Sequence, residues 1–205
     1  MDLSSALLES GTVNDEIYSD TMKEYYSDRT LLMNTVVTDD VLEDIILHIL
    51  LWNKDDKDLP REKRQPIKLY LDSDGGSVFA ANNLIDVIRT SETPVYAIGF
   101  SMVASAAFSI FISCDKRYAF EHTVFLIHDG SKSISNSGSK ARDFMDFLDR
   151  IDDLEKELIL ERTSIPEEDY EKKKRDEQFF FSAEAKDKSI VDEIIGVDCA
   201  LDDIL

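Results

Sequence analysis

The stretch KLYLDSDGGSVFAANNLIDVIRTSETPVYAIG, residues 68–99, combines two kinds of hydrophobic pattern. Its ends, KLYLD (68–72) and PVYAIG (94–99), are short β-branched or aromatic runs, as expected of strands. Between them, apolar residues at 81, 84, 85 and 88 have the spacing of an amphipathic helix. Two more strand-like runs follow, KRYAF (116–120) and TVFLI (123–127). The chain is therefore predicted to be an α/β protein with βαβ units and a mostly parallel sheet.

The composition excludes several classes of protein. With 205 residues, 43% of them hydrophobic, the chain can bury one core, so a single domain is expected. The net charge of −20 would repel a phosphate backbone, which argues against nucleic acid as a ligand. Cys114 and Cys199 are too few for a disulfide framework or metal cluster, and they favour a reducing, cytoplasmic location. The N-terminus lacks a secretory pattern and the apolar stretch 99–114 is too short to span a bilayer, so no membrane association is expected.

The pattern along the chain divides it into an arm and one domain. Residues 1–28 are polar and acidic without a sustained hydrophobic period, so an N-terminal arm is expected before a single domain over 29–205. A strand at 31–37 leads into a helix, and a second, long helix runs from about 139 to 163. The first helix is expected to bury a face formed by Val41, Leu42, Ile45, Ile46, Ile49 and Leu50. The apolar face of the long helix consists of Phe144, Phe147, Leu148, Ile151, Leu154 and Leu158.

Three features follow the carboxyl ends of predicted strands. Gly75-Gly76 opens a helix after the first strand, where glycines let backbone N–H groups point outward toward an anion. Ser105 stands among small residues between a strand ending near Gly99 and an apolar helix. His128 directly follows the strand 123–127. Because ligands bind at the carboxyl ends of strands in open α/β sheets, these three features are expected to meet in one cleft.

Each feature also has a purely structural explanation. The glycine pair alone fits an ordinary strand-to-helix turn, and Ser105 alone fits a helix N-cap. His122 comes before the strand that His128 follows, so it is expected to point away from the cleft. His48 lies off the apolar face of its helix and is expected to be structural.

With these residues in view, the chain resembles the proteolytic subunit of the Clp protease, a self-compartmentalising serine peptidase. The resemblance is to a divergent form of that subunit, and a phage-type form is one option. The segments LYLDSDGGSV, MVASAAF, KRYAFEHTVFLIH, FSAEA and IVDEII carry the resemblance and run in the family's order from about residue 29 to residue 195. The resemblance implies that Ser105 is the nucleophile and His128 the general base. It further implies that the backbone N–H groups of Gly76 and Ala106 form the oxyanion hole.

The sequence departs from the family at several positions. The family usually has proline at the position of Asp74, glycine at that of Ser101 and a Gln-Pro or similar pair at that of Asp129-Gly130. Asp74 beside an oxyanion hole would oppose negative charge there unless its side chain turns to solvent.

The third member of the triad is ambiguous in the sequence. Aligning on FSA places Gln178 where the family has aspartate, which would leave no anion beside the imidazolium. Counting from His128 without a gap reaches Glu177 instead, and Asp176 is one residue further back. Glu177 is the preferred candidate.

The resemblance also implies an architecture and partners. The family fold is a crotonase-like α/β unit with an extended handle, here the region of about 129–163, and subunits assemble into two stacked heptameric rings. A Clp-type AAA+ unfoldase docks on the rings and feeds protein or peptide substrates through a pore lined by N-terminal loops, for which residues 1–28 are the candidate. The chemistry requires no metal or organic cofactor.

Two other functions remain open from the sequence, and a third is disfavoured. Gln178 and Asp74 would suit a catalytically silent, structural subunit of a Clp-type ring. A crotonase-type acyl-CoA enzyme would share the fold and the glycine-supported oxyanion hole, although the VASAA segment and His128 together favour the peptidase. A signal-peptide-peptidase relative would need a catalytic lysine and usually a membrane anchor, and the sequence offers neither arrangement.

Overall fold

The computed structural model describes residues 20–130, 137–172 and 176–204. Its strands are β1 (Thr30–Met33), β2 (Ile67–Ser73), β3 (Val95–Ala104), β4 (Lys116–Phe120), β5 (Val124–Ile127), β6 (Gln178–Phe181) and β7 (Glu193–Ile195). Its α-helices are α2 (Leu47–Asp55), α3 (Val78–Thr90), α4 (Ala106–Ser113), α5 (Gly138–Arg162), α6 (Glu167–Lys172) and α7 (Ser182–Asp187). A π-helical segment, η1 (Leu42–Ile46), precedes α2, and short 3-10 turns occur at η2 (Arg61–Lys63) and η3 (Leu201–Asp203).

One sheet organises the described residues, as the sequence predicted. Its strands follow the order β1-β2-β3-β4-β7, and every pair along this path is parallel. Strand β5 pairs in parallel with the C-terminal part of β3, and β6 pairs antiparallel with β5. The connections β2-α3-β3 and β3-α4-β4 are the expected βαβ units, because a parallel pair needs a crossover that a helix supplies.

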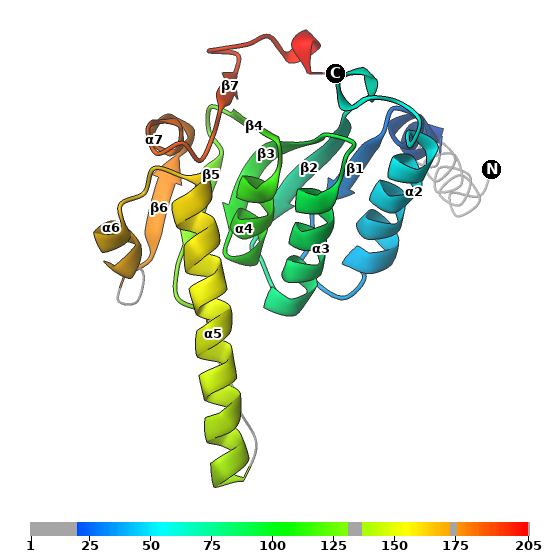
Figure 1. The fold of residues 1–205 in the computed structure, drawn as a ribbon. Helices are drawn as coiled ribbons and strands as arrows, with labels where there is room; N and C mark the ends of the chain where they lie inside the picture. Colours follow the sequence, from blue (N-terminus) through cyan, green and yellow to red (C-terminus); the bar gives the residue numbers. More distant parts are fainter. Residues whose placement is uncertain (1–19, 131–136, 173–175, 205) are drawn as a thin grey trace, which may run out of the picture.

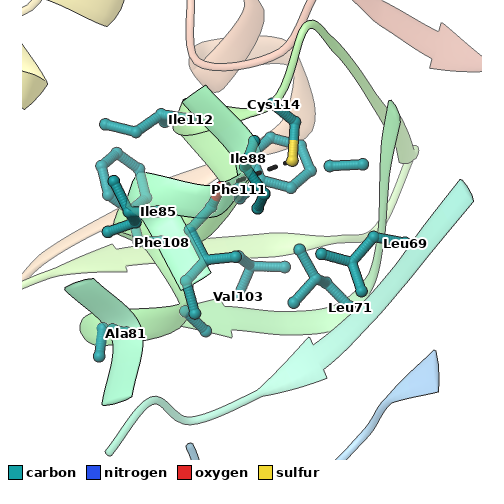
Figure 2. Close-up of a cluster of buried hydrophobic side chains, with 14 of the residues drawn as sticks. Leu69, Leu71, Ala81, Ile85, Ile88, Val103, Phe108, Phe111, Ile112 and Cys114 are labelled. Atoms are coloured by element: carbon teal, nitrogen blue, oxygen red, sulfur yellow. Dashed lines mark hydrogen bonds between the residues drawn. The ribbon is translucent and has the colours of Figure 1, made fainter. Parts of the chain in front are cut away.

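Helix α4 explains why the stretch 99–114 is so apolar. Helices α2, α3 and α4 lie side by side over one face of the sheet (Figure 1). All eight residues of α4 are buried, because α4 packs on β3 and β5 below it and on α3 and α5 beside it. Figure 2 shows Phe108 and Phe111 of α4 among Ile85 and Ile88 of α3 and Val103 of β3. The sheet, α3 and α4 thus share one hydrophobic core.

The long helix is confirmed, but most of its expected apolar face is not buried. Only Leu158 and Ile159, near its C-terminal end, are buried, whereas Phe144, Phe147 and Leu154 are exposed. Figure 1 shows the reason: α5 touches the body of the subunit near its C-terminal end, and its other end extends well beyond the sheet.

The structure adds detail to one expectation near the N-terminus and corrects another. Residues 20–27 of the expected arm form a helix, and the rings of Tyr26 and His48 stack with centroids 5.1 Å apart. In the first helix, Leu42 and Leu50 are exposed, because the π-helical turn η1 changes the phase of the apolar stripe before α2 begins. Residues 1–19 lie outside the described part, so the arm boundary at residue 28 stays a prediction.

Strand β3 is longer than the sequence suggested. It continues past Gly99 to Ala104 and ends directly before Ser105. The reason is that its second half pairs with β5, with Ala104 opposite Leu126. Among the described helices, none has the length and apolarity that a membrane span requires.

Candidate active site

Adjacent parallel strands bring Ser105 and His128 to the same edge of the sheet. Ala104 of β3 is paired with Leu126 of β5. The backbone N–H of Ser105 then donates to the carbonyl of Leu126 at 3.0 Å. His128 follows the end of β5 at Ile127. Ser105 and His128 therefore both lie within two positions of the paired residues Ala104 and Leu126. The predicted convergence at the carboxyl strand ends is confirmed for these two residues.

Ser105 forms a strained turn between β3 and α4. Its backbone angles are φ 54° and ψ −125°, a conformation that costs a non-glycine residue about 1–3 kcal/mol. Ser105 occupies the N-cap position of α4, but its hydroxyl makes no capping hydrogen bond to the helix. The helix-cap explanation for this serine is therefore wrong. A strained strand-to-helix turn whose serine hydroxyl does not cap the helix resembles the arrangement of a nucleophile elbow.

The two glycines have different tasks in the turn after β2. Gly75 has φ +94°, and a Cβ atom on it would lie 2.7 Å from both the Ala104 carbonyl oxygen and Ser105 Cβ. The turn can therefore touch the Ser105 elbow only because residue 75 has no side chain. The sequence analysis singled out Gly76 and missed this contact.

Gly76 is held by the segment that follows β1. The N–H of Val37 donates to the Gly75 carbonyl and the N–H of Ser77 donates to the Val37 carbonyl, both at 2.8 Å. In a parallel bridge of this kind the N–H of the central residue, Gly76, points away from Val37. Gly76 has φ +152°, and a Cβ atom on it would lie 2.4 Å from the Val37 carbonyl oxygen, so this position excludes a side chain.

Ala106 is the other residue expected to provide an oxyanion donor. It is the first residue of α4 and 5% exposed, and a first-turn N–H has no acceptor within its own helix. Within the described part of the chain, neither the Ala106 N–H nor the Gly76 N–H donates to another backbone group outside regular helices and strands. Both donors are thus available to an oxygen atom bound beside Ser105.

The antiparallel pairing of β5 with β6 brings Glu177 to His128. The ladder pairs Ile127 with Gln178, and one step further it sets Glu177 opposite His128. Glu177 Oε1 lies 3.6 Å from His128 Nδ1. The imidazole is 30% exposed and the carboxylate 60%, so water reaches this pair. An anion at this distance can orient the ring and stabilise its protonated form.

The two other candidates for the third position are placed differently. Gln178 is opposite the buried Ile127, and because neighbours along a strand point to opposite faces, its side chain turns away from the face that holds Glu177. Its amide donates to the Asp169 carbonyl at 2.7 Å. Asp176 is exposed, and its backbone N–H donates to the Lys172 carbonyl.

No hydrogen bond joins Ser105 Oγ to the His128 ring within the described residues. Ser105 and His128 therefore lie at the same edge of the sheet without the hydrogen bond that proton transfer requires. Catalytic hydrogen bonds are often long or absent in structures without substrate. Asp74 is exposed, so its side chain is open to solvent, the condition under which it would not oppose charge in the expected oxyanion hole.

The other serines of the stretch 99–114 and His122 divide into buried and exposed residues. Ser109 Oγ donates to Glu155 Oε1 at 3.2 Å, and Ser113 Oγ donates to the Ser109 carbonyl at 2.7 Å, so both buried hydroxyls are satisfied. Ser101 and His122 are exposed, and His122 precedes β5 as expected.

The cysteines and acidic groups do not form a metal site in the part of the chain that the structure describes. Burial raises the pKa of the Cys114 thiol, which lies at the C-terminal end of α4 and donates to the Ile110 carbonyl, the dashed contact in Figure 2. Desolvation also raises the pKa of Cys199. Both thiols are poor nucleophiles, since the thiolate is the reactive form.

Comparison with known proteins identifies the family. A family model described as Clp protease matches residues 13–198. The ATP-dependent Clp protease proteolytic subunit 2 of Thermobifida fusca (strain YX) is 28% identical over 185 residues, covering 87% of this chain and 86% of that protein. The corresponding proteolytic subunit of Paracoccus denitrificans is 28% identical over 161 residues, covering 78% and 77%. A solved ClpP1 mutant from Listeria monocytogenes matches with a TM-score of 0.72 at 25% identity, covering 85% of this chain and 95% of its own. A chain matched over nearly its whole length by one family, with the same fold, belongs to the Clp protease family.

Proposed function

We propose that the chain is an active serine endopeptidase subunit that cleaves peptide bonds through an acyl-enzyme. Ser105 is the nucleophile, His128 the general base and Glu177 the anion that orients His128. The backbone N–H groups of Gly76 and Ala106 hold the oxyanion. Family membership supports a peptidase, and it leaves the acyl-CoA and signal-peptide-peptidase alternatives without support.

The mechanism follows from these assignments. His128 takes the proton of Ser105 Oγ as that oxygen attacks the peptide carbonyl, and the negative oxygen of the tetrahedral intermediate accepts from the two N–H groups. His128 then gives the proton to the leaving amine, and the C–N bond breaks to leave an acyl-serine. Water, deprotonated by His128, attacks the acyl-serine and frees Ser105. The chain's own side chains account for every proton transfer.

The observation that carries the proposal is the Ser105 elbow. Ser105 is held at φ 54°, and its hydroxyl does not cap the helix that it starts, so capping does not explain a serine at this position. Such strain persists where the surrounding structure holds it for a function. The 3.6 Å contact between Glu177 and His128 gives the base the orienting anion that the Gln178 alignment would remove.

The assembly is part of the same proposal. The exposed apolar side chains along α5 favour contact with another copy of the chain, as in stacked heptameric rings. The relatives are named as ATP-dependent, which supports a Clp-type AAA+ unfoldase as partner and unfolded protein as substrate. We place the protease in the cytoplasm.

Labelling with a fluorophosphonate probe tests the proposal. Intact mass spectrometry of the assembled protein is expected to show one adduct on the wild type and none on Ser105→Ala. Ser109→Ala is the matched control, because Ser109 lies on the same helix but is satisfied by Glu155; it should keep the adduct. An unlabelled wild type in correctly assembled rings would reject the peptidase and favour a silent structural subunit.

A further inference from the structure

The glycine turn after β2 presents one of the two proposed oxyanion donors, the N–H of Gly76. Gly75 has φ +94° and Gly76 has φ +152°, backbone angles that glycine adopts at little cost. The same freedom lowers the cost of rotating the peptide group between the two glycines. A rotated group would point the Gly76 N–H toward the segment after β1 instead of away from it. The turn therefore needs bonds from outside it to keep this N–H in one orientation.

The first of these bonds holds the peptide group between the glycines itself. The carbonyl of Gly75 accepts from the N–H of Val37 at 2.8 Å. Because the C=O and N–H of a trans peptide point in opposite directions, this bond directs the Gly76 N–H away from Val37. The orientation of the group also depends on the peptide group before it, which ends in the Gly75 N–H.

A buried side chain, Ser73, holds the Gly75 N–H. Ser73 is the last residue of β2 and is 4% exposed. Its Oγ accepts from the Gly75 N–H at 3.2 Å and donates to the Thr35 carbonyl at 2.5 Å. A hydroxyl has one proton, and donating it to Thr35 leaves the lone pairs of the oxygen for Gly75. Ser73 thus ties the turn to residues 35–37, the same segment that holds the Gly75 carbonyl.

These contacts serve the turn and not the ladder of the sheet. Thr35 lies after the end of β1 and Gly75 after the end of β2, so both partners of Ser73 are outside the strands. The side chain before it acts on the other neighbour of β2: Asp72 Oδ1 accepts from the Met102 N–H of β3 at 3.2 Å. Alanine at position 73 would leave the turn without its side-chain tie to the segment after β1.

We propose that Ser73 is a positioning residue for the oxyanion hole. Its hydroxyl fixes the Gly75 N–H and thereby the next peptide group, which presents the Gly76 N–H to the oxyanion. The inference rests on the proposed function, because the Gly76 N–H has a catalytic task only if Ser105 forms a tetrahedral intermediate. Ser73 acts through the turn and does not touch the substrate. Its loss therefore weakens binding of the transition state and leaves binding of the substrate unchanged.

Steady-state cleavage of a fluorogenic peptide tests this division. Loss of an oxyanion donor costs about 10²–10³ in kcat, so Ser73→Ala, which only releases the donor, is expected to lower kcat about 10–100-fold and to change KM less than about twofold. Unchanged kcat, or a loss that appears only in KM, overturns the inference.

Ser91→Ala is the matched control. Ser91 is 9% exposed, and its Oγ donates to the Thr93 carbonyl at 2.6 Å and accepts from the Asn53 amide at 2.7 Å. The control therefore loses the same two kinds of hydrogen bond as Ser73→Ala. Ser91 precedes β3, at the edge of the sheet opposite to Ser105, so the control should keep the wild-type kcat. Equal losses of kcat in the two variants would show general damage and overturn the inference.

A pair of inhibitors separates positioning from damage to the site as a whole. A peptide aldehyde forms a hemiacetal with Ser105: the bond from Oγ to the carbonyl carbon forms, the π electrons of the carbonyl move to its oxygen, and the Oγ proton passes to His128. That oxygen occupies the oxyanion hole, whereas the corresponding peptide alcohol binds without a covalent bond. Both inhibitors carry the sequence of the fluorogenic peptide that the wild type cleaves fastest. Ser73→Ala should weaken the aldehyde at least about tenfold and the alcohol less than about twofold. Equal weakening of both inhibitors, or an unchanged aldehyde, rejects the positioning role.

Ser73→Cys keeps the question decidable if Ser73→Ala does not assemble. A thiol nearly keeps the size of the side chain but is a weak donor and acceptor, so the aldehyde is expected to lose at least about threefold in affinity with the alcohol unchanged. An unchanged aldehyde affinity in this variant overturns the inference.

Fluorophosphonate labelling distinguishes failure of this inference from failure of the proposed function. A labelled wild type whose aldehyde affinity is unaffected by Ser73→Ala would reject the role of Ser73 and leave the peptidase in place. An unlabelled wild type in correctly assembled rings would reject the peptidase and, with it, the role of Ser73.

Discussion

The contact between Gly75 and the Ser105 elbow gives a sharp prediction for Gly75→Ala. At φ +94° a non-glycine residue pays about 1–2 kcal/mol of backbone strain. The added methyl would also lie 2.7 Å from the Ala104 carbonyl oxygen and from Ser105 Cβ, and 2.9 Å from the Ala106 nitrogen. Two of these three atoms are backbone, so the elbow itself must move. Overpacking of this kind typically costs about 1–3 kcal/mol more.

Gly196→Ala is the matched control. Gly196 has φ +87°, nearly the angle of Gly75, but a Cβ atom on it meets nothing within 4 Å. Gly196→Ala therefore has the backbone strain without the clash. Each variant replaces one glycine by alanine, so the conformational entropy of the unfolded chain falls by the same amount in both. Their difference in unfolding free energy, about 1–3 kcal/mol, isolates the close approach of the two turns.

Thermal unfolding and serine labelling together measure both consequences. For a chain of this size about 1 kcal/mol shifts Tm by roughly 2–4 °C, so Gly75→Ala is expected to melt about 2–12 °C below Gly196→Ala. Because the displaced atoms belong to the elbow and to Ala106, the proposed oxyanion donor, Gly75→Ala should also lose fluorophosphonate labelling while Gly196→Ala keeps it. Equal melting temperatures, or full labelling of Gly75→Ala, would refute the reasoning.

Three further predictions concern other parts of the molecule. Glu177→Gln should lower peptidase turnover about 10²–10⁴-fold with assembly intact, whereas Gln178→Ala should change turnover little; the opposite ranking would return the third position to Gln178. Asp56→Asn should lower the unfolding free energy by about 3 kcal/mol at pH 7, because Asp56 is buried with the Arg29 guanidinium 2.8 Å away. The ion pair with Arg29 lowers the pKa of Asp56. The stability that the pair contributes is therefore fully present above the carboxyl's ordinary pKa of about 4 and is lost as pH falls through the lowered pKa. Urea unfolding at pH 7 and pH 3 should show that the variant loses less unfolding free energy at pH 3, and an equal loss at both pH values would contradict this account. Phe147→Asp, in the exposed part of α5, should shift the sedimenting species to half its mass if α5 joins two rings, and an unchanged species would reject that role.

Several features follow from local pattern and were predicted from the sequence. The apolar spacing at 81, 84, 85 and 88 predicts α3, whose residues at these positions are all buried. The short apolar runs predict β2, β4 and β5, and their carboxyl ends predict the edge at which Ser105 and His128 meet. These inferences succeed because helix and strand periods are local, and because parallel strands that alternate with helices have their carboxyl ends on one edge.

Other features depend on contacts between distant segments. Nothing local to Ser105 indicates its left-handed backbone, which is imposed by β5 through the Leu126 carbonyl and by the close approach of Gly75. The spacing of apolar residues along α5 predicts a helix but not that most of its length extends away from the body, since the same stripe suits a core or another copy of the chain.

The choice among Asp176, Glu177 and Gln178 shows where the limit lies. By itself the sequence determined the strands, the crossover helices and the residue types that the proposed serine peptidase needs. Which acid faces His128 was decided only by the antiparallel register of β6 on β5, where a slip of one residue would exchange Glu177 for a neighbour on the other face of the strand. That register is set by the burial of Phe125 and Phe180 against the core, a contact between residues 55 positions apart, and no pattern within either strand specifies it.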